Sequence, residues 1–331
     1  MPNVKNWWFA AFRKRVDKKT VSELLRASGQ KIIFPFYHVV SNDPIPHIRH
    51  LYTYRNVAAF ESDMDFLLRH FTPLHFDDYV KGRYEPDKPY FHLSFDDGLS
   101  EMYHIVRPIL LEKGIPATFF INSGFADNQA LFYRYKVSVL IDTVSESDLS
   151  KAISIATGAG NIQVKKPIRF LLSLRAAQEK LIDDIASAAG IDFKQYLTEV
   201  LPYMDSHQLR KLQQDDFTLG AHSVDHPEFY NLAPIAQQEQ IKQSVAFVRD
   251  TFQIERPPFA FPFTADGADK NLMTDMYAHY GVSKSFGTSG IQKEKYPNHI
   301  DRIPAEYKDW SLESIVKSEL HYFTAKKMLG R

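Results

Sequence analysis

Apolar residues along this chain follow two rhythms, one typical of buried strands and the other of amphipathic helices. From Met102 the apolar positions recur at helical spacing, at Ile105, Val106, Ile109 and Leu110, which places them on one helix face. Short continuous apolar runs predict strands at 31–40, 90–95, 117–122, 217–222, 259–263 and 282–286. Further helical patterns separate them, at 57–71, 241–252 and 270–280. This alternation predicts parallel strands joined by helical crossovers, in a number sufficient to close a barrel.

The strand pattern disappears between about residues 125 and 215. Segments such as SDLSKAISIATGAG and LRAAQEKLIDDIASAAG are helical in composition and end in glycine, a common end signal of helices. We therefore expect a helical insertion at about 125–215, built on one βα-loop of a barrel domain that spans 30–331. Residues 1–29 are expected to form an N-terminal helical extension.

Composition removes several classes of protein from consideration. In 331 residues, Lys and Arg together number 40 and so do Asp and Glu, so no surplus charge points to a nucleic-acid partner, and none is expected. The chain has no cysteine, which excludes disulfides, thiolate metal ligands and a cysteine nucleophile. No apolar run reaches the length of a membrane-spanning helix.

The N-terminus combines an apolar patch, 7–12, with the basic residues Arg13, Lys14 and Arg15. The patch is too short for a secretory signal and lacks a cleavage site of small residues, so a cytoplasmic location is expected. Tryptophans beside basic residues suit the headgroup region of a membrane, which leaves peripheral membrane contact through this segment open. We expect instead a helix that packs on the protein body.

Two polar motifs follow predicted strands. SFDDG places Asp96 and Asp97 after the run 90–95, and HSVDH places His222 and His226 after the run 217–222. Each motif alone is inconclusive, because Asp-Asp-Gly is also a common turn. Together they lie at the carboxyl ends of parallel strands, where such folds build their sites. One carboxylate and two imidazoles make a three-ligand site for a divalent metal, and the second carboxylate is then free to act as a base.

The paired motifs resemble those of the polysaccharide deacetylases with a NodB homology domain, carbohydrate esterase family 4. SFDDG is similar to the family's first motif and HSVDH to its second, and the segments that follow both motifs are also similar. The resemblance implies an α/β fold, a distorted (β/α) barrel, that removes acetyl groups from an N-acetylated carbohydrate substrate. It assigns metal ligation to Asp97, His222 and His226 and the role of base to Asp96. The implied cofactor is Zn²⁺, with Co²⁺, Ni²⁺ or Fe²⁺ as alternatives.

The third family motif normally supplies an arginine that orients the base aspartate. In ERPPFAFPF, Arg256 matches the motif's letters, but the register that begins at Ala260 matches its strand context better and lacks the arginine. Some relatives take the guanidinium from a later strand, and IDRIPAE offers Arg302 at such a place. The alternative for Arg302 is a surface ion pair.

The fifth motif, which usually carries the general acid, is missing from the chain. We predict that His38, at the end of the first predicted strand, supplies the acid; the alternative is a hydrogen-bonded core histidine.

Two other functions remain open from the sequence alone. Relatives of this barrel hydrolyse C–N bonds of small cyclic amides and imides, and a helical insertion over the site could enclose such a substrate. The altered motifs could also mark a carbohydrate-binding protein without turnover.

Overall fold

The barrel is built from short parallel strands whose order follows the chain. The computed structural model describes residues 4–158, 164–293, 295–307 and 309–330. Its larger sheet has the order β10-β9-β8-β7-β6-β5-β2-β11, and every pairing is parallel. These strands are β2 (Pro35–Tyr37), β5 (Leu93–Phe95), β6 (Ala117–Ile121), β7 (Thr218–Ala221), β8 (Phe259–Ala260), β9 (Ser285–Gly287), β10 (His299–Asp301) and β11 (Ile303–Pro304).

One extended segment closes the barrel. Only Arg302 separates β10, which pairs with β9, from β11, which pairs with β2. The two edges of the sheet therefore meet in a single stretch of chain, and the predicted (β/α) barrel is confirmed. Strand β6 is buried along its whole length, because a parallel barrel is covered by helices outside and by side chains inside.

A second, three-stranded sheet of order β1-β4-β3 lies next to the barrel. It contains β1 (Ile32–Ile33), β3 (Thr72–Pro73) and β4 (Tyr90–Phe91). The apolar runs 31–40 and 90–95, each predicted as one strand, therefore pass from this sheet into the barrel. The change falls at Phe34 in the first run and at His92 in the second.

Helices cover the barrel, and the apolar periodicity predicts those at 57–71, from Met102, at 241–252 and at 270–280. They are α3 (Val57–His70), α4 (Phe76–Lys81), α5 (Arg107–Lys113), α11 (Ser206–Gln214), α12 (Pro234–Phe252) and α13 (Lys270–Ala278). The helix predicted from Met102 begins as a π-helical turn, Met102–Val106, that continues into α5. Pro108 explains this irregular start, since it has no N–H for the bond of a regular α-helix.

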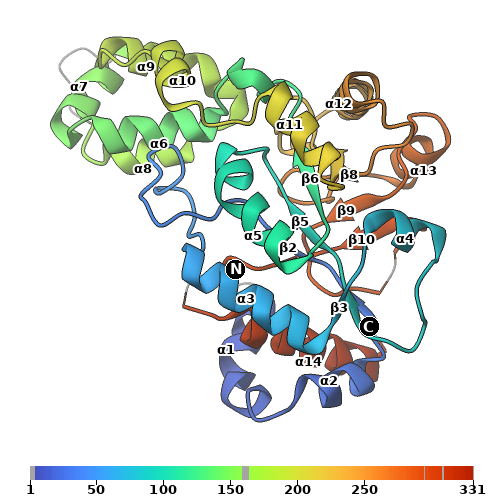
Figure 1. Ribbon diagram of the computed structural model, residues 1–331. Coiled ribbons are helices and arrows are strands. Elements are labelled where there is room, and N and C mark those ends of the chain that lie inside the picture. The colour runs from blue at the N-terminus through green and yellow to red at the C-terminus, as the bar shows by residue number, and fades with distance from the viewer. Residues whose placement is uncertain (1–3, 159–163, 294, 308, 331) are drawn as a thin grey trace.

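The segment between β6 and β7 forms a helical lobe beside the barrel (Figure 1). The lobe contains α6 (Tyr133–Thr143), α7 (Glu146–Ala156), α8 (Pro167–Ser173), α9 (Glu179–Ala188) and α10 (Phe193–Val200). In this segment the structure describes all residues except 159–163, and the described part contains no strand. Helix α11, which the expected insertion of 125–215 included, packs against β7.

Three helices from the two chain ends pack together below the barrel in Figure 1: α1 (Val4–Val16), α2 (Val21–Ser28) and α14 (Leu312–Met328). Trp8 of α1 donates its indole N–H to His321 of α14 at 3.3 Å, so α1 packs on the protein body as expected. Membrane contact through this helix stays a prediction. Among the described residues, no helix has both the length and the apolar character needed to cross a membrane.

Candidate active site

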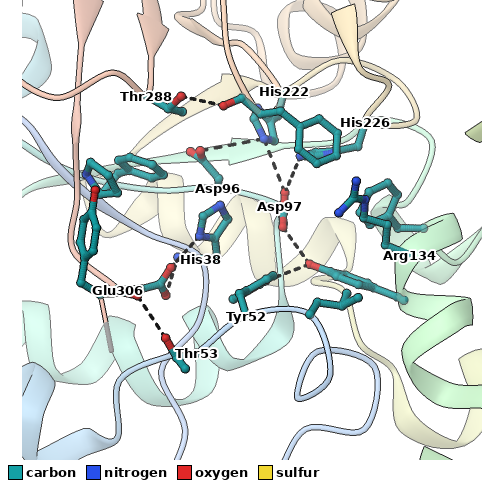
Figure 2. Close-up of a pocket in the computed structure, with 17 residues that line it drawn as sticks. His38, Tyr52, Thr53, Asp96, Asp97, Arg134, His222, His226, Thr288 and Glu306 are labelled. Carbon is teal, nitrogen blue, oxygen red and sulfur yellow. Dashed lines mark hydrogen bonds and ion pairs between the residues drawn. The ribbon is translucent and has the colours of Figure 1, made fainter. Parts of the chain in front are cut away.

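The carboxyl ends of the barrel strands surround a cavity of about 450 Å³ (Figure 2). His38 follows β2, the pair Asp96 and Asp97 follows β5, and His222 follows β7. Parallel strands end at one rim of a barrel, so residues far apart in the sequence line the same space. His226, four residues after His222, lines it too.

Asp97, His222 and His226 form a compact three-membered group. One ligand atom from each side chain lies within 4.8 Å of the others. Asp97 Oδ1 is 3.5 Å from His222 Nε2 and 3.3 Å from His226 Nε2. All three residues are buried, and the backbone of Asp97 adopts a left-handed conformation with φ of 73°, which is unusual for a residue other than glycine.

The orientation of His222 comes from the neighbouring strand β8. Its Nδ1 donates to the carbonyl oxygen of Ala260 at 2.8 Å, which leaves Nε2 as the nitrogen that faces Asp97 Oδ1 at 3.5 Å. This arrangement is typical of a metal-binding histidine, whose second nitrogen is held by a backbone carbonyl. It also shows why the register beginning at Ala260 suits the site although it lacks the arginine.

His226 is placed by a tight turn and not by a helix. Its backbone N–H donates to Ser223 Oγ at 3.1 Å, and Val224 N–H donates to Gln240 of α12 at 2.9 Å. Ser223 and His226 have positive φ values of 67° and 57°. Pro227 disfavours a right-handed helical conformation at His226, which explains the turn.

The three side chains fit a divalent cation. Asp97 Oδ1 is buried without a hydrogen-bond partner, an arrangement that costs free energy unless something else satisfies the oxygen. Burial lowers the pKa of His226 and so favours a neutral imidazole. Burial raises the pKa of Asp97, but the adjacent imidazoles lower it more, so the pKa lies well below its ordinary value. An ionised carboxylate facing imidazole nitrogens is a usual donor set for zinc and similar metals.

Asp96 is clamped by Arg302. The guanidinium donates to both carboxylate oxygens, at 2.6 and 2.7 Å, and also to Ser94 Oγ and to the carbonyl oxygen of Gly287. Arg302 is fully buried, so it is not the surface ion pair considered as the alternative. Burial raises the pKa of Asp96, but the charge of Arg302 outweighs this and holds the pKa below its ordinary value.

Arg256, the other arginine considered for this position, lies away from Asp96. Its guanidinium donates to the backbone carbonyl oxygens of Tyr277 and Val282. It therefore holds the turn before β9 and takes no part in the cavity.

His38 lines the cavity and pairs with Glu306. Its Nδ1 lies 2.6 Å from Glu306 Oε2, while Oε1 accepts the backbone N–H groups of His38 and Val39. Burial lowers the pKa of His38, but the Glu306 carboxylate raises it by more, so the pKa is about 9. The ring is therefore a proton donor at neutral pH, unlike a neutral core histidine.

The helical lobe supplies part of the cavity wall. The first turn of α6 brings Arg134, labelled in Figure 2, to the cavity. Tyr135 of the same turn and Phe132 just before it also line the cavity. The hydroxyl of Tyr135 donates to Asp97 Oδ2 at 2.7 Å. The insertion thus touches the candidate metal site directly.

The profile of the polysaccharide deacetylase family matches residues 83–282, more than half of the chain. The chain belongs to this family. Membership identifies this deacetylase-family protein as a hydrolase related to enzymes that act on sugar N-acetyl groups. A search of curated proteins found no match.

Solved structures of deacetylases share the fold of this family member. Streptococcus pyogenes deacetylase PplD, in complex with acetate, aligns at 14% identity with a TM-score of 0.57, covering 88% of this chain and 98% of that one. IcaB from Ammonifex degensii aligns at 14% identity and a TM-score of 0.54, over 88% and 98%. A de-N-acetylase from Aggregatibacter actinomycetemcomitans aligns at 14% identity and 0.53, over 86% and 99%. At such identities the likeness establishes the fold.

The structure brings all six residues singled out from the sequence, Asp96, Asp97, His222, His226, His38 and Arg302, to one place; their chemical roles stay predictions. Sequence reasoning missed Glu306 and Tyr135. Glu306 carried a usable signal, because it is an acidic residue just after the segment IDRIP at the strand rim. Tyr135 carried none, because it lies inside an ordinary helical pattern.

Proposed function

We propose that this family member is a metal-dependent deacetylase that hydrolyses the acetamido group of N-acetylated sugars. The observation that carries the proposal is the buried, unpartnered Oδ1 of Asp97, which faces the Nε2 atoms of His222 and His226. A second carboxylate, Asp96, lies next to this group and is held in place by an arginine.

Asp97, His222 and His226 would hold the metal, most simply Zn²⁺, which supplies Lewis-acid activation of water and of the acetyl carbonyl when bound. Asp96 lies beside the group, with Oδ2 3.9 Å from His222 Nε2. Its low pKa keeps it ionised at neutral pH, so it can accept the proton that a water loses on attacking the acetyl carbon. Both of its oxygens remain bound to Arg302, which fixes its orientation.

His38 is placed to complete the reaction as the acid. When the carbon–nitrogen bond breaks, the leaving amine needs a proton, and the protonated imidazole of His38 can donate it. Glu306 holds the ring through Nδ1, which leaves Nε2 to face the substrate. The products are acetate and a free amino sugar.

The size of the cavity suits the binding of one or two sugar units. Its volume of about 450 Å³ lies in the range of small-ligand sites. Its walls include aromatic side chains on which a sugar ring can pack, namely those of Tyr52, Phe132, Phe263 and Tyr307.

The test combines metal analysis with acetate release from N-acetylglucosamine oligomers. We expect about one equivalent of divalent metal in the purified protein, and removal of the metal by a chelator should stop acetate release. Asp97→Ala should lose the metal and lower kcat/KM by about a thousandfold or more, since several kcal/mol of transition-state stabilisation disappear.

Asp225→Ala is the control, because Asp225 is an exposed aspartate of the loop that carries His222 and His226 and lies outside the cavity lining. It should leave metal content and turnover close to wild type. Full metal content and turnover in Asp97→Ala would contradict the proposal.

A further inference from the structure

Tyr135 reaches the candidate metal site from outside the barrel. It lies in the first turn of α6, in the helical lobe, and is buried to 1% exposure. Its hydroxyl donates to Asp97 Oδ2 at 2.7 Å. The two residues are 38 positions apart in the sequence, so the contact depends on the lobe lying against the barrel rim.

Because of this hydrogen bond, the two carboxylate oxygens of Asp97 have different surroundings. Oδ2 is occupied by the tyrosine, whereas Oδ1 has no hydrogen-bond partner and faces His222 and His226 at 3.5 and 3.3 Å. A carboxylate without a partner on Oδ2 could rotate and present either oxygen. With Oδ2 held by an O–H donor, Oδ1 is the oxygen presented to a metal.

The ring of Tyr135 is itself fixed by its neighbours. It packs edge-on against Phe132 at 5.2 Å between centroids, lies near His47 at 5.3 Å and stacks with Tyr203 at 6.2 Å. The hydroxyl of Tyr52 is 3.3 Å from that of Tyr135. Since Asp97 can only accept, Tyr135 gives its proton to Asp97 and has lone pairs left for the Tyr52 hydroxyl.

We propose that Tyr135 is a positioning residue that orients Asp97 for metal binding, so that the helical lobe completes the metal site. This inference rests on the proposed metal-dependent function. Hydrogen bonds to metal-binding carboxylates commonly change metal affinity by 10- to 100-fold when removed, and Tyr135 makes such a bond.

A different role would be to dock the lobe on the barrel. The structure contains another hydrogen bond that docks the lobe without contacting Asp97: the hydroxyl of Tyr196, in α10, binds His47 Nδ1 at 2.9 Å. Tyr196 does not line the cavity. Tyr196→Phe is therefore a matched control, since it also removes one tyrosine hydroxyl between the lobe and the residues before α3.

The experiment compares wild type, Tyr135→Phe and Tyr196→Phe in the metal-free form. Zn²⁺ affinity is measured by competition with a chromogenic chelator, and Tm is measured without metal. We expect Tyr135→Phe to weaken Zn²⁺ binding by about 10- to 100-fold and Tyr196→Phe to change it by less than about threefold, with similar small losses in Tm. Tyr52→Phe, which loosens the Tyr135 hydroxyl, should weaken binding by a smaller factor and provides a second probe if Tyr135→Phe does not fold.

Two results would overturn the inference. Wild-type affinity in Tyr135→Phe would show that Asp97 needs no positioning, and equal losses in Tyr135→Phe and Tyr196→Phe would show that docking alone matters. Failure of the wild-type protein to bind Zn²⁺ would instead overturn the proposed function, together with the inference that rests on it.

Discussion

His38 and Glu306 form a charged pair that lines the same cavity as the metal-binding group. Three hydrogen bonds hold Glu306 to the ring and backbone of His38 and to the backbone of Val39. The charges that face His38 are Glu306, Asp96 and Asp97, all of which raise its pKa, and burial, which lowers it, is outweighed. The rings of Phe36 and Tyr52 cover the imidazole. Glu306 therefore controls the protonation of His38.

We predict that Glu306→Gln shifts the alkaline limb of the pH–kcat profile to lower pH. The protonated form of His38 is the proposed acid, so turnover should fall as pH rises through its pKa of about 9. Without the Glu306 charge this pKa drops, and turnover should fall at a pH at least about one unit lower. The profile of acetate release against pH measures the shift.

Glu85→Gln serves as the control for this prediction, because Glu85 is exposed and pairs only with the exposed Lys88 among the described residues. Its profile should match that of wild type. An unchanged alkaline limb in Glu306→Gln would assign the acid to another group.

Strand β7 positions His222 through close packing against its neighbours. Gly220, two residues before His222, lies close to both β6 and the segment before β8. A Cβ atom there would lie 2.6 Å from the Phe120 ring and 2.9 Å from the carbonyl oxygen of Pro258. Glycine is thus required by space and not by its backbone conformation. A change at this position should reach the active site through the strand.

Gly220→Ala is expected to lower the free energy of unfolding by about 1–3 kcal/mol, the usual cost of overpacking a core, and to reduce metal affinity by displacing His222. Denaturant unfolding and Zn²⁺ competition measure the two effects. Gly82→Ala is the control, because a Cβ there meets no atom within 4 Å and only its φ of +66° is unfavourable. It should cost about 1 kcal/mol without changing metal affinity; a wild-type metal affinity in Gly220→Ala would refute the coupling.

Two buried polar links join distant parts of the molecule, one within the barrel and one between the two sheets. Within the barrel, Arg302 joins the closing segment to Ser94 of β5 and to Asp96, two strands along the same sheet. His92 joins the small sheet to the barrel: its Nδ1 donates to the carbonyl oxygen of Leu74, and its Nε2 accepts from Thr118 Oγ1, both at 2.8 Å. Both imidazole nitrogens are used only if the ring is neutral. Protonation would therefore break a link between the sheets.

We predict that His92 makes the fold less stable in acid. Burial lowers the pKa of His92 from 6.5 to about 4, so the unfolded chain binds the proton more tightly than the folded one. The stabilisation is complete above pH 6.5 and is lost as pH falls towards 4, by about 3 kcal/mol. Denaturant unfolding at several pH values measures it. His92→Gln should be less stable at pH 7 and should show a flatter decline below pH 6.5, whereas a decline parallel to that of wild type would contradict the prediction.

Much of the active site could be predicted from residues near strand ends. Asp96, Asp97 and His222 directly follow apolar runs, and parallel strands necessarily bring their carboxyl ends to one rim. The same rule and the motif resemblance suggested His38 and Arg302. Strand ends were less predictable. The runs 31–40 and 90–95 each contribute one strand to the small sheet and one to the barrel, and the point of change depends on pairing partners from elsewhere in the chain.

Local periodicity by itself thus determined the alternation of strands and helices along the chain. The barrel, the family and the set of candidate ligands followed from the resemblance of the paired motifs to those of the polysaccharide deacetylases. The tertiary structure alone decided which groups support those ligands. Arg302 meets Asp96 because the barrel closes, and Glu306 meets His38 for the same reason. Tyr135 meets Asp97 because a helical lobe folds back over the rim. Such contacts join segments far apart along the chain. The motif resemblance suggested Arg302 and a position at the strand rim marked Glu306, but no local pattern indicates the contact of Tyr135 with Asp97.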